Sequence, residues 1–135
     1  MRLLAASLLL LLGTAVSAQP LQPVQRVPRI GVAGSDLDAC LSLGQVTGLN
    51  PQGDNFLAVR AMPAADGAEK DRLGPGRMIF ICDQAGEWLG VVYDPDPNAE
   101  PGDCGVGSPV ETERPYVGRC RWGWVHSRFV TVIAG

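Results

Sequence analysis

The sequence has very little concentrated positive charge: Lys70 is its only lysine, and its arginines are scattered along the chain. The formal net charge is −3, which becomes −4 when Arg2 near the start is left out. Nucleic-acid binding depends on clustered cations that neutralise phosphates, so we expect no nucleic-acid partner. The same lack gives no reason to expect strong attraction to anionic lipid.

Residues for metal binding and catalysis are also scarce. No C-x-x-C pair occurs, and His126, the only histidine, does not lie near a cysteine pair at zinc-ligand spacing. The acidic stretch 94–100 lacks the glycine and the final glutamate of a calcium loop. Neighbouring residues on a strand point to opposite faces, so His126 and Ser127 do not form a catalytic pair. We therefore expect no metal, no cofactor and no enzymatic activity.

Only one long apolar run is present, from Leu3 to Leu12, and it is shorter than the roughly 20 residues that cross a bilayer. Arg2 precedes it, and small residues ending at Ala18 follow. This pattern is typical of a secretory signal peptide over 1–18, with a retained membrane anchor as the alternative. We expect the mature chain to be periplasmic or secreted, without stable membrane insertion.

Four cysteines follow this segment: Cys40, Cys82, Cys104 and Cys120. An even number in a small exported protein predicts two disulfide bonds, for which three pairings exist. We favour Cys104 with Cys120, because they bracket one irregular loop. That choice leaves Cys40 to pair with Cys82.

The rest of the chain divides into a leader and one domain. Residues 19–37 contain three prolines and no apolar period, which predicts an extended, mobile leader of undetermined role. Residues 38–135 lack helical periodicity over any ten residues and contain short β-branched and aromatic segments, which predicts an all-β domain. Strands are expected near 44–49, 56–60, 77–82, 88–93, 120–126 and 131–133, with 77–82 and 88–93 forming a hairpin. Long loops are expected over 61–76 and 94–119.

Several linked motifs occur in one order between Phe56 and Ile133. The sequence L-A-V-R-A-M-P begins at Leu57, L-G-P-G-R-M-I-F begins at Leu73, W-L-G-V-V-Y begins at Trp88, and G-W-V-H-S-R-F-V begins at Gly123. Together they resemble a bacterial SH3 domain. The resemblance implies a small SH3-like barrel, here with an extra N-terminal strand within 40–49 and a long disulfide-stapled loop over 94–119.

The resemblance also implies a shallow aromatic groove that binds an extended peptide. The candidate ligand-binding residues are Trp88, Tyr93, Tyr116 and Trp122, although each ring could instead pack in the core. For Trp124 and Phe129 we favour core packing. The expected ligand is a cell-wall (peptidoglycan) peptide or an extended segment of another envelope protein.

A second hypothesis makes the loop 94–119 the working surface. Its acidic residues Asp94, Asp96, Glu100 and Asp103 would then face a basic partner protein, as an inhibitor or immunity-type protein would. Both departures from the usual SH3 pattern, the long loop and the extra strand, could create surfaces that typical members lack. The ligand and the oligomeric state are not specified by the sequence.

Overall fold

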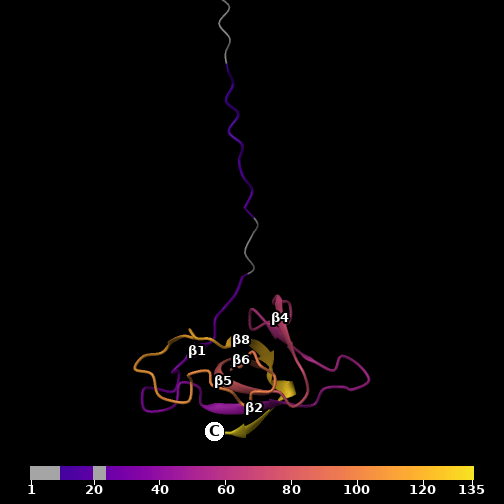
Figure 1. Cartoon of the computed structure of the whole chain (residues 1–135), viewed down its shortest axis with the longest axis vertical. Helices are drawn as coiled ribbons and strands as arrows, with labels where there is room; N and C mark the ends of the chain where they lie inside the picture. Colours follow the sequence, from indigo (N-terminus) through magenta and orange to yellow (C-terminus); the bar gives the residue numbers. More distant parts are fainter. Residues whose placement is uncertain (1–9, 20–23) are drawn as a thin grey trace, which may run out of the picture.

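The computed structural model describes residues 10–19 and 24–135, and the chain is all-β (Figure 1). Its elements are β1 (Arg29–Ile30), β2 (Ser42–Val46), β3 (Leu57–Arg60), β4 (Glu69–Leu73), β5 (Met78–Ala85), β6 (Trp88–Tyr93), β7 (Arg114–Pro115), β8 (Arg121–His126), the single 3₁₀ turn η1 (Ser127–Phe129) and β9 (Val130–Ala134). Strands β1 and β7 form a small separate sheet. All six strands expected from the sequence are therefore present, within a few residues of the expected bounds.

The main sheet has seven strands in the order β4-β3-β8-β6-β5-β2-β9, and the strands β8, β6, β5 and β2 follow one another across the body in Figure 1. The β5–β6 hairpin forms as expected, with Phe80 opposite Val92. Strand β2 is an integral member of the sheet, because it pairs with both β5 and β9. Strands β4 and β9 stand at opposite ends of the order, so the expected barrel does not close.

Strand β4 lies inside the segment 61–76, where the sequence predicts only a loop. Its residues are mostly charged, and such side chains have low strand propensity. It forms because β3 offers a pairing partner, with Leu57 opposite Leu73 and a bulge between Val59 and Arg60. Leu73 is the one buried residue of the strand, and it fixes the register. The second expected loop, 94–119, is correct apart from the two residues of β7.

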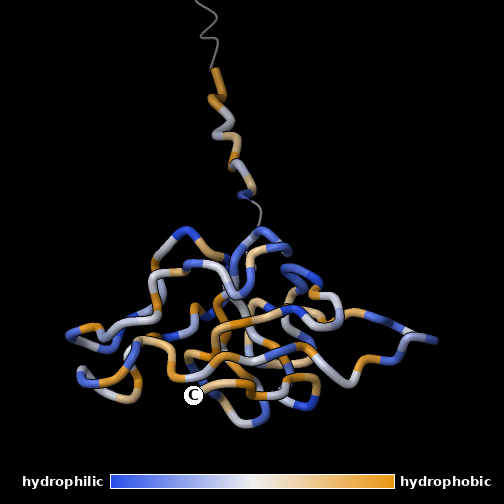
Figure 2. Tube along the Cα trace, turned by 60° about the horizontal axis from the view of Figure 1, so that its bottom comes forward, coloured by the Kyte–Doolittle hydropathy of each residue, from blue (hydrophilic) through white to orange (hydrophobic). Residues whose placement is uncertain are grey.

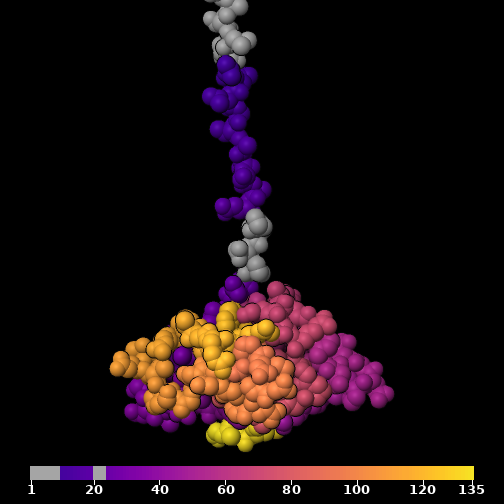
Figure 3. Space-filling model, in the orientation of Figure 1, coloured from indigo at the N-terminus to yellow at the C-terminus, as the bar shows by residue number. Residues whose placement is uncertain are grey.

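The sheet has a buried cluster on each face, because successive side chains of a strand point in opposite directions. One cluster contains Val46, Leu57, Val59, Leu73, Ile79, Val91, Tyr93 and Val125. The other contains Ile30, Ala39, Cys40, Cys82, Val92, Cys104, Val106, Tyr116 and Cys120. Figure 2 shows the apolar residues concentrated on the central strands and hydrophilic residues on the peripheral loops. The second cluster thus depends on the loop 94–119, whose residues cover part of the face seen in Figure 3.

Both disulfides have the pairing expected from the sequence. Cys40 is bonded to Cys82 on β5, and Cys104 is bonded to Cys120 at the end of the long loop. The two bridges lie in the same buried cluster, so they join the loop and the segment before β2 to one face of the sheet. Disulfides of this kind point to an oxidising environment outside the cytosol.

The N-terminal segment is only partly described by the structure. Of the expected signal peptide, 1–9 lie outside the described residues, and 10–18 are exposed without regular secondary structure. Within 10–19 and 24–135, no helix is long and apolar enough to span a membrane. Of the expected leader, 20–23 lie outside the described residues.

The part of the leader from Arg26 to Ile30 is packed against the sheet, so the expectation of a mobile segment is wrong there, whereas the side chains of 32–37 are exposed. The amide of Arg26 donates to the carbonyl of Ala61 at 2.9 Å, and the indole Nε1 of Trp124 donates to the carbonyl of Arg26 at 2.7 Å. Pro28 is fully buried, and Ile30 is only 3% exposed. The folded domain therefore begins before residue 38.

Candidate functional site

An open cleft of about 820 Å³ lies between the segment 48–60, the start of β6 and the turn η1. Three aromatic side chains line it, Phe56, Trp88 and Phe129, and all three are half-buried. The complete lining is Gly48, Leu49, Asn50, Asp54, Phe56, Leu57, Ala58, Arg60, Glu69, Trp88, His126, Arg128 and Phe129. An open hollow with convergent aromatic and polar groups is the usual form of a ligand-binding site.

His126 positions the aromatic wall of the cleft. It lies opposite Trp88 in the β6–β8 register, and the two rings meet edge to face with centroids 5.4 Å apart. Its Nδ1 accepts the backbone N–H of Arg128 at 3.1 Å, which caps the turn η1. Phe129 ends that turn, and its ring centroid lies 6.5 Å from the His126 ring. His126 thus lies between Trp88 on β6 and Phe129 on η1, with its ring near both.

Charged groups surround this aromatic wall. Arg60 and Arg128 both line the cleft, and the guanidinium carbon of Arg128 lies 5.8 Å from the Phe129 ring centroid. Asp54 and Glu69 also line it, and Glu69 is ion-paired with Arg72 at 3.2 Å. The cleft can therefore hold an apolar or planar group against its rings and a charged group beside it.

Trp88 is the one sequence-predicted ligand-binding residue that lies in this cleft. Tyr93 is 1% exposed, and its hydroxyl donates to Oδ2 of Asp71 at 2.9 Å. Burial, followed by the hydrogen bond with the Asp71 carboxylate, raises the pKa of Tyr93 far above its ordinary value. Its ring packs in the core with Val91, and it lines a smaller hollow together with Trp122, away from the aromatic cleft.

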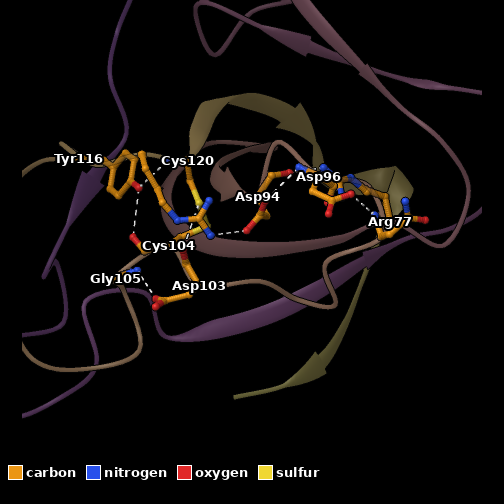
Figure 4. Close-up of polar contacts among 10 residues, drawn as sticks. Arg77, Asp94, Asp96, Asp103, Cys104, Gly105, Tyr116 and Cys120 are labelled. Atoms are coloured by element: carbon orange, nitrogen blue, oxygen red, sulfur yellow. Dashed lines mark hydrogen bonds and ion pairs between the residues drawn. A yellow bond between two sulfur atoms is a disulfide. The ribbon is translucent and has the colours of Figure 1, made fainter.

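Tyr116 is also a core residue, with 4% of its surface exposed. Its hydroxyl donates to the carbonyl of Cys104 at 3.1 Å and accepts the amide N–H of Cys120 at 3.2 Å (Figure 4). These bonds join the two ends of the Cys104–Cys120 bridge. Tyr116 therefore holds the loop in place, and the prediction of a role in the groove does not fit its burial.

Trp122 is half-buried and lies at the other end of the β6–β8 pair from Trp88. The Nζ atom of Lys70 sits 2.9 Å from its ring centroid and donates to its carbonyl at 2.8 Å. Much of the Lys70 side chain is exposed, but partial burial of the ammonium group lowers its pKa to about 8. The negative charge of Asp71 acts in the opposite direction and raises this pKa, but its effect is smaller. Trp88 and Trp122 consequently belong to two separate surfaces.

The acidic residues of the loop 94–119 are mostly bound to the protein itself. Asp94, labelled in Figure 4, is 5% exposed, and Nη2 of Arg119 lies 2.5 Å from its Oδ2. The hydrogen bond from Arg119, with a second from the Asp96 amide, lowers the pKa of the Asp94 carboxyl. The Asp94 carboxylate therefore does not face a partner, contrary to the loop hypothesis. Asp96, Glu100 and Asp103 remain exposed, although Asp96 and Asp103 each accept a backbone N–H of the loop.

Sequence reasoning did not find Phe56, Arg60 or Arg128 as cleft residues. It assigned Phe129 to the core, and Phe129 does pack against a core cluster, but it also lines the cleft. Phe56 precedes β3, while Phe129 belongs to a short turn between the last two strands. Their proximity follows from the register that pairs Arg60 with Trp124 and Trp88 with His126. The only local signal is the short H-S-R-F segment, which interrupts two apolar strands and could have indicated an exposed turn.

Comparisons with protein-family models, with curated proteins and with solved structures found no match to this chain. The fold and the site define a disulfide-bonded all-β domain with an open aromatic cleft. The chemistry of the cleft is therefore the feature that indicates a function.

Proposed function

We propose that this protein is an exported, non-catalytic binding module whose cleft holds an extended peptide of the cell wall or of another envelope protein. The observation that carries the proposal is the convergence of Phe56, Trp88 and Phe129 on one open cleft. Half-buried rings suit such a ligand, because a planar apolar face packs on an extended chain at a low entropic cost. The groove is thus built from Trp88 and residues other than Tyr93, Tyr116 and Trp122.

The arrangement of the strands supports an SH3-like interpretation of the fold. The motif residues lie on β3, β5, β6 and β8, and η1 separates β8 from β9 where the resemblance implies a short helical turn. Trp88 begins its strand, and Gly123 and Trp124 lie together on β8. Two disulfides and the signal-like pattern over 1–18 support a periplasmic or secreted location.

The bonding of His126 supports a non-catalytic role. Its Nδ1 is occupied by the N–H of Arg128, and its Nε2 lies 3.4 Å from the carboxylate of Glu87. The Nδ1 atom is therefore engaged by the backbone, and the Nε2 atom lies beside an exposed carboxylate. A general base for a neighbouring hydroxyl would need one of these nitrogens free to accept its proton.

Co-sedimentation tests the proposal. The oxidised chain from residue 19 to 135 is incubated with insoluble peptidoglycan, and the bound fraction is measured for the wild type and for Phe129→Ala. We expect the wild type to sediment and Phe129→Ala to lose most of its binding while it keeps a cooperative thermal transition. Absence of wild-type binding to peptidoglycan, and to extended peptides from envelope proteins, would contradict the proposal.

The loop 94–119 is the alternative binding surface, and the exposed Asp96, Glu100 and Asp103 favour it. Shortening the loop is an unsuitable test, because the loop supplies Cys104 and Val106 to a buried cluster. The variant Asp96→Asn/Glu100→Gln/Asp103→Asn removes the charges and keeps an oxygen acceptor at each position. Retained peptidoglycan binding by this variant favours the cleft, whereas its loss favours the loop.

A further inference from the structure

We infer that the cleft recognises a carboxylate group of its peptide ligand through Arg60 and Arg128, an inference that rests on the proposed function. The two residues come from different elements, β3 and η1, and both line the cleft beside its aromatic wall. The chain as a whole is acidic, with a formal charge of −3. A pair of cations at one hollow therefore runs against the general charge of the molecule.

Neither arginine is neutralised by the protein in the part of the chain that the structure describes. Arg29, Arg72, Arg119 and Arg121 each form an ion pair with a carboxylate, but Arg60 and Arg128 do not. Arg60 makes one long hydrogen bond, from Nη1 to the carbonyl of Gly67 at 3.4 Å. Its other guanidinium N–H groups are left to bind a ligand.

The charged side chains that line the cleft have a net positive charge once those already paired within the protein are set aside. Glu69 is bound by Arg72 through two of its guanidinium nitrogens, so its charge is compensated within the protein. Arg60 and Arg128 contribute +2 and Asp54 contributes −1, which leaves +1 for the lining groups that are not already paired. A peptide carboxylate satisfies the two arginines, and an amino group of the same peptide is accommodated beside Asp54.

The chemistry of the guanidinium group favours a carboxylate over a neutral carbonyl. Its planar fork of N–H donors matches the two oxygens of a carboxylate, and charge-assisted bonds of this kind are roughly twice as strong as neutral ones. The half-buried rings of Trp88 and Phe129 form an apolar side of the cleft beside Arg128. A ligand that covers these rings would shield the ionic contact partly from solvent, and partly buried ion pairs are screened less by salt.

Calorimetry with a defined peptide tests this inference. The probe is the stem peptide of peptidoglycan, prepared with its carboxylates free and with the same carboxylates amidated. We expect the amidated peptide to bind the oxidised wild-type chain about tenfold more weakly, which corresponds to the loss of one charged hydrogen-bond pair. Arg60→Gln and Arg128→Gln should each reduce this preference. Arg114→Gln, at an exposed arginine of β7 outside the cleft, should leave it unchanged.

The outcomes separate the inference from the proposed function. Equal binding of the two peptides that still requires Phe129 would overturn the carboxylate inference and leave the peptide-binding function intact. A preference that survives both arginine variants would overturn the assignment to Arg60 and Arg128. No binding of either peptide by the wild type would count against both. Thermal unfolding of each variant confirms that it is folded, and Arg128→Lys, which keeps the charge without the fork, should retain only part of the preference.

Discussion

Gly123 stands where β8 passes close to β3, and no side chain fits there. A Cβ atom at this position would meet the side chain of Val59 and come within 2.9 Å of the carbonyl oxygen of Arg60. The motif residue therefore permits the close backbone approach that brings Arg60 opposite Trp124. Its neighbour Trp124 is completely buried and donates its indole N–H to the leader.

Replacing Gly123 by alanine should lower the free energy of unfolding by about 1–3 kcal/mol, the usual effect of overpacking a filled core. Urea denaturation of the oxidised protein measures the change. Gly107→Ala is the matched control, because an added Cβ there meets nothing within 4 Å. Equal stabilities for the two variants would show that the β3–β8 contact is looser than described.

The Asp94–Arg119 pair should make part of the stability depend on pH. The hydrogen bond from Arg119 lowers the pKa of Asp94 below its ordinary 3.8, so the ionised carboxylate stabilises the folded state. This contribution is complete above the unfolded-state value and is lost as the pH falls through the lower folded-state value. Arg119→Ala should therefore lower the melting temperature at pH 7, and its difference from the wild type should shrink below about pH 3.8. A difference that stays constant down to pH 2 would contradict this account.

Single residues were the least predictable part of the site. The sequence shows that Tyr93 and Tyr116 are aromatic and lie near turn-rich segments, which fits either a groove or a core. What decides between them is that both faces of the sheet are covered: Tyr93 packs with Val91 on one face, and Tyr116 packs with Val92 on the other. The loop 94–119 covers the second face, and its sequence contains no periodic pattern that would predict its path.

At the scale of elements, the segment Arg26–Ile30 acts as a strap across β6 and β8, on the face of the sheet that carries Gly90 and Trp124. The side chain of Arg26 lies over the Trp124 ring, 5.0 Å from its centroid, and Pro28 fills the space above Gly90. The carbonyl of Pro28 accepts the amide N–H of Tyr116 at 2.9 Å. The strap therefore joins the main sheet to the stapled loop.

Removing the strap should destabilise the domain. A chain that begins at Gly31 loses the buried Pro28 and Ile30, and burial of one large apolar side chain contributes about 1.5–3 kcal/mol. We expect its free energy of unfolding to fall by at least that amount in urea denaturation. A chain that begins at Val24 keeps the strap and should match the chain from residue 19. Full stability of the shorter chain would show that the segment is a passive leader after all.

The strands themselves could be predicted well, because β-branched and aromatic residues between turn formers mark β2, β3, β5, β6, β8 and β9. Strand β4 was missed because four of its five residues are charged and its pairing comes from β3. The strap was missed for a similar reason: its five residues, with Pro28 at their centre, give no periodic signal, and its position is set by contacts with Trp124, Gly90 and Tyr116. In both cases the element is specified by its partner more than by its own sequence.

At the scale of the whole molecule, the two disulfides should differ in their contribution to stability. They close chain segments with sequence separations of 42 and 16 residues. In the chain-entropy model these loops correspond to about 4 and about 3 kcal/mol. Both disulfides are removed in turn, by the double variants Cys40→Ala/Cys82→Ala and Cys104→Ala/Cys120→Ala. Each variant should unfold at a lower urea concentration than the wild type, and the decrease should be larger for Cys40→Ala/Cys82→Ala. The reverse order would indicate that the packing of the loop outweighs the entropy of the unfolded chain.

The molecule as a whole presents two partly exposed tryptophans on separate surfaces, and only Trp88 lies in the aromatic cleft. The measurement that tests this account most directly is co-sedimentation of Trp88→Ala and Trp122→Ala with peptidoglycan, beside the wild type, with the folded state of each variant checked by its thermal transition. We predict that Trp88→Ala loses most of its binding and that Trp122→Ala binds like the wild type. Loss of binding by Trp122→Ala with full binding by Trp88→Ala would contradict the assignment of the cleft.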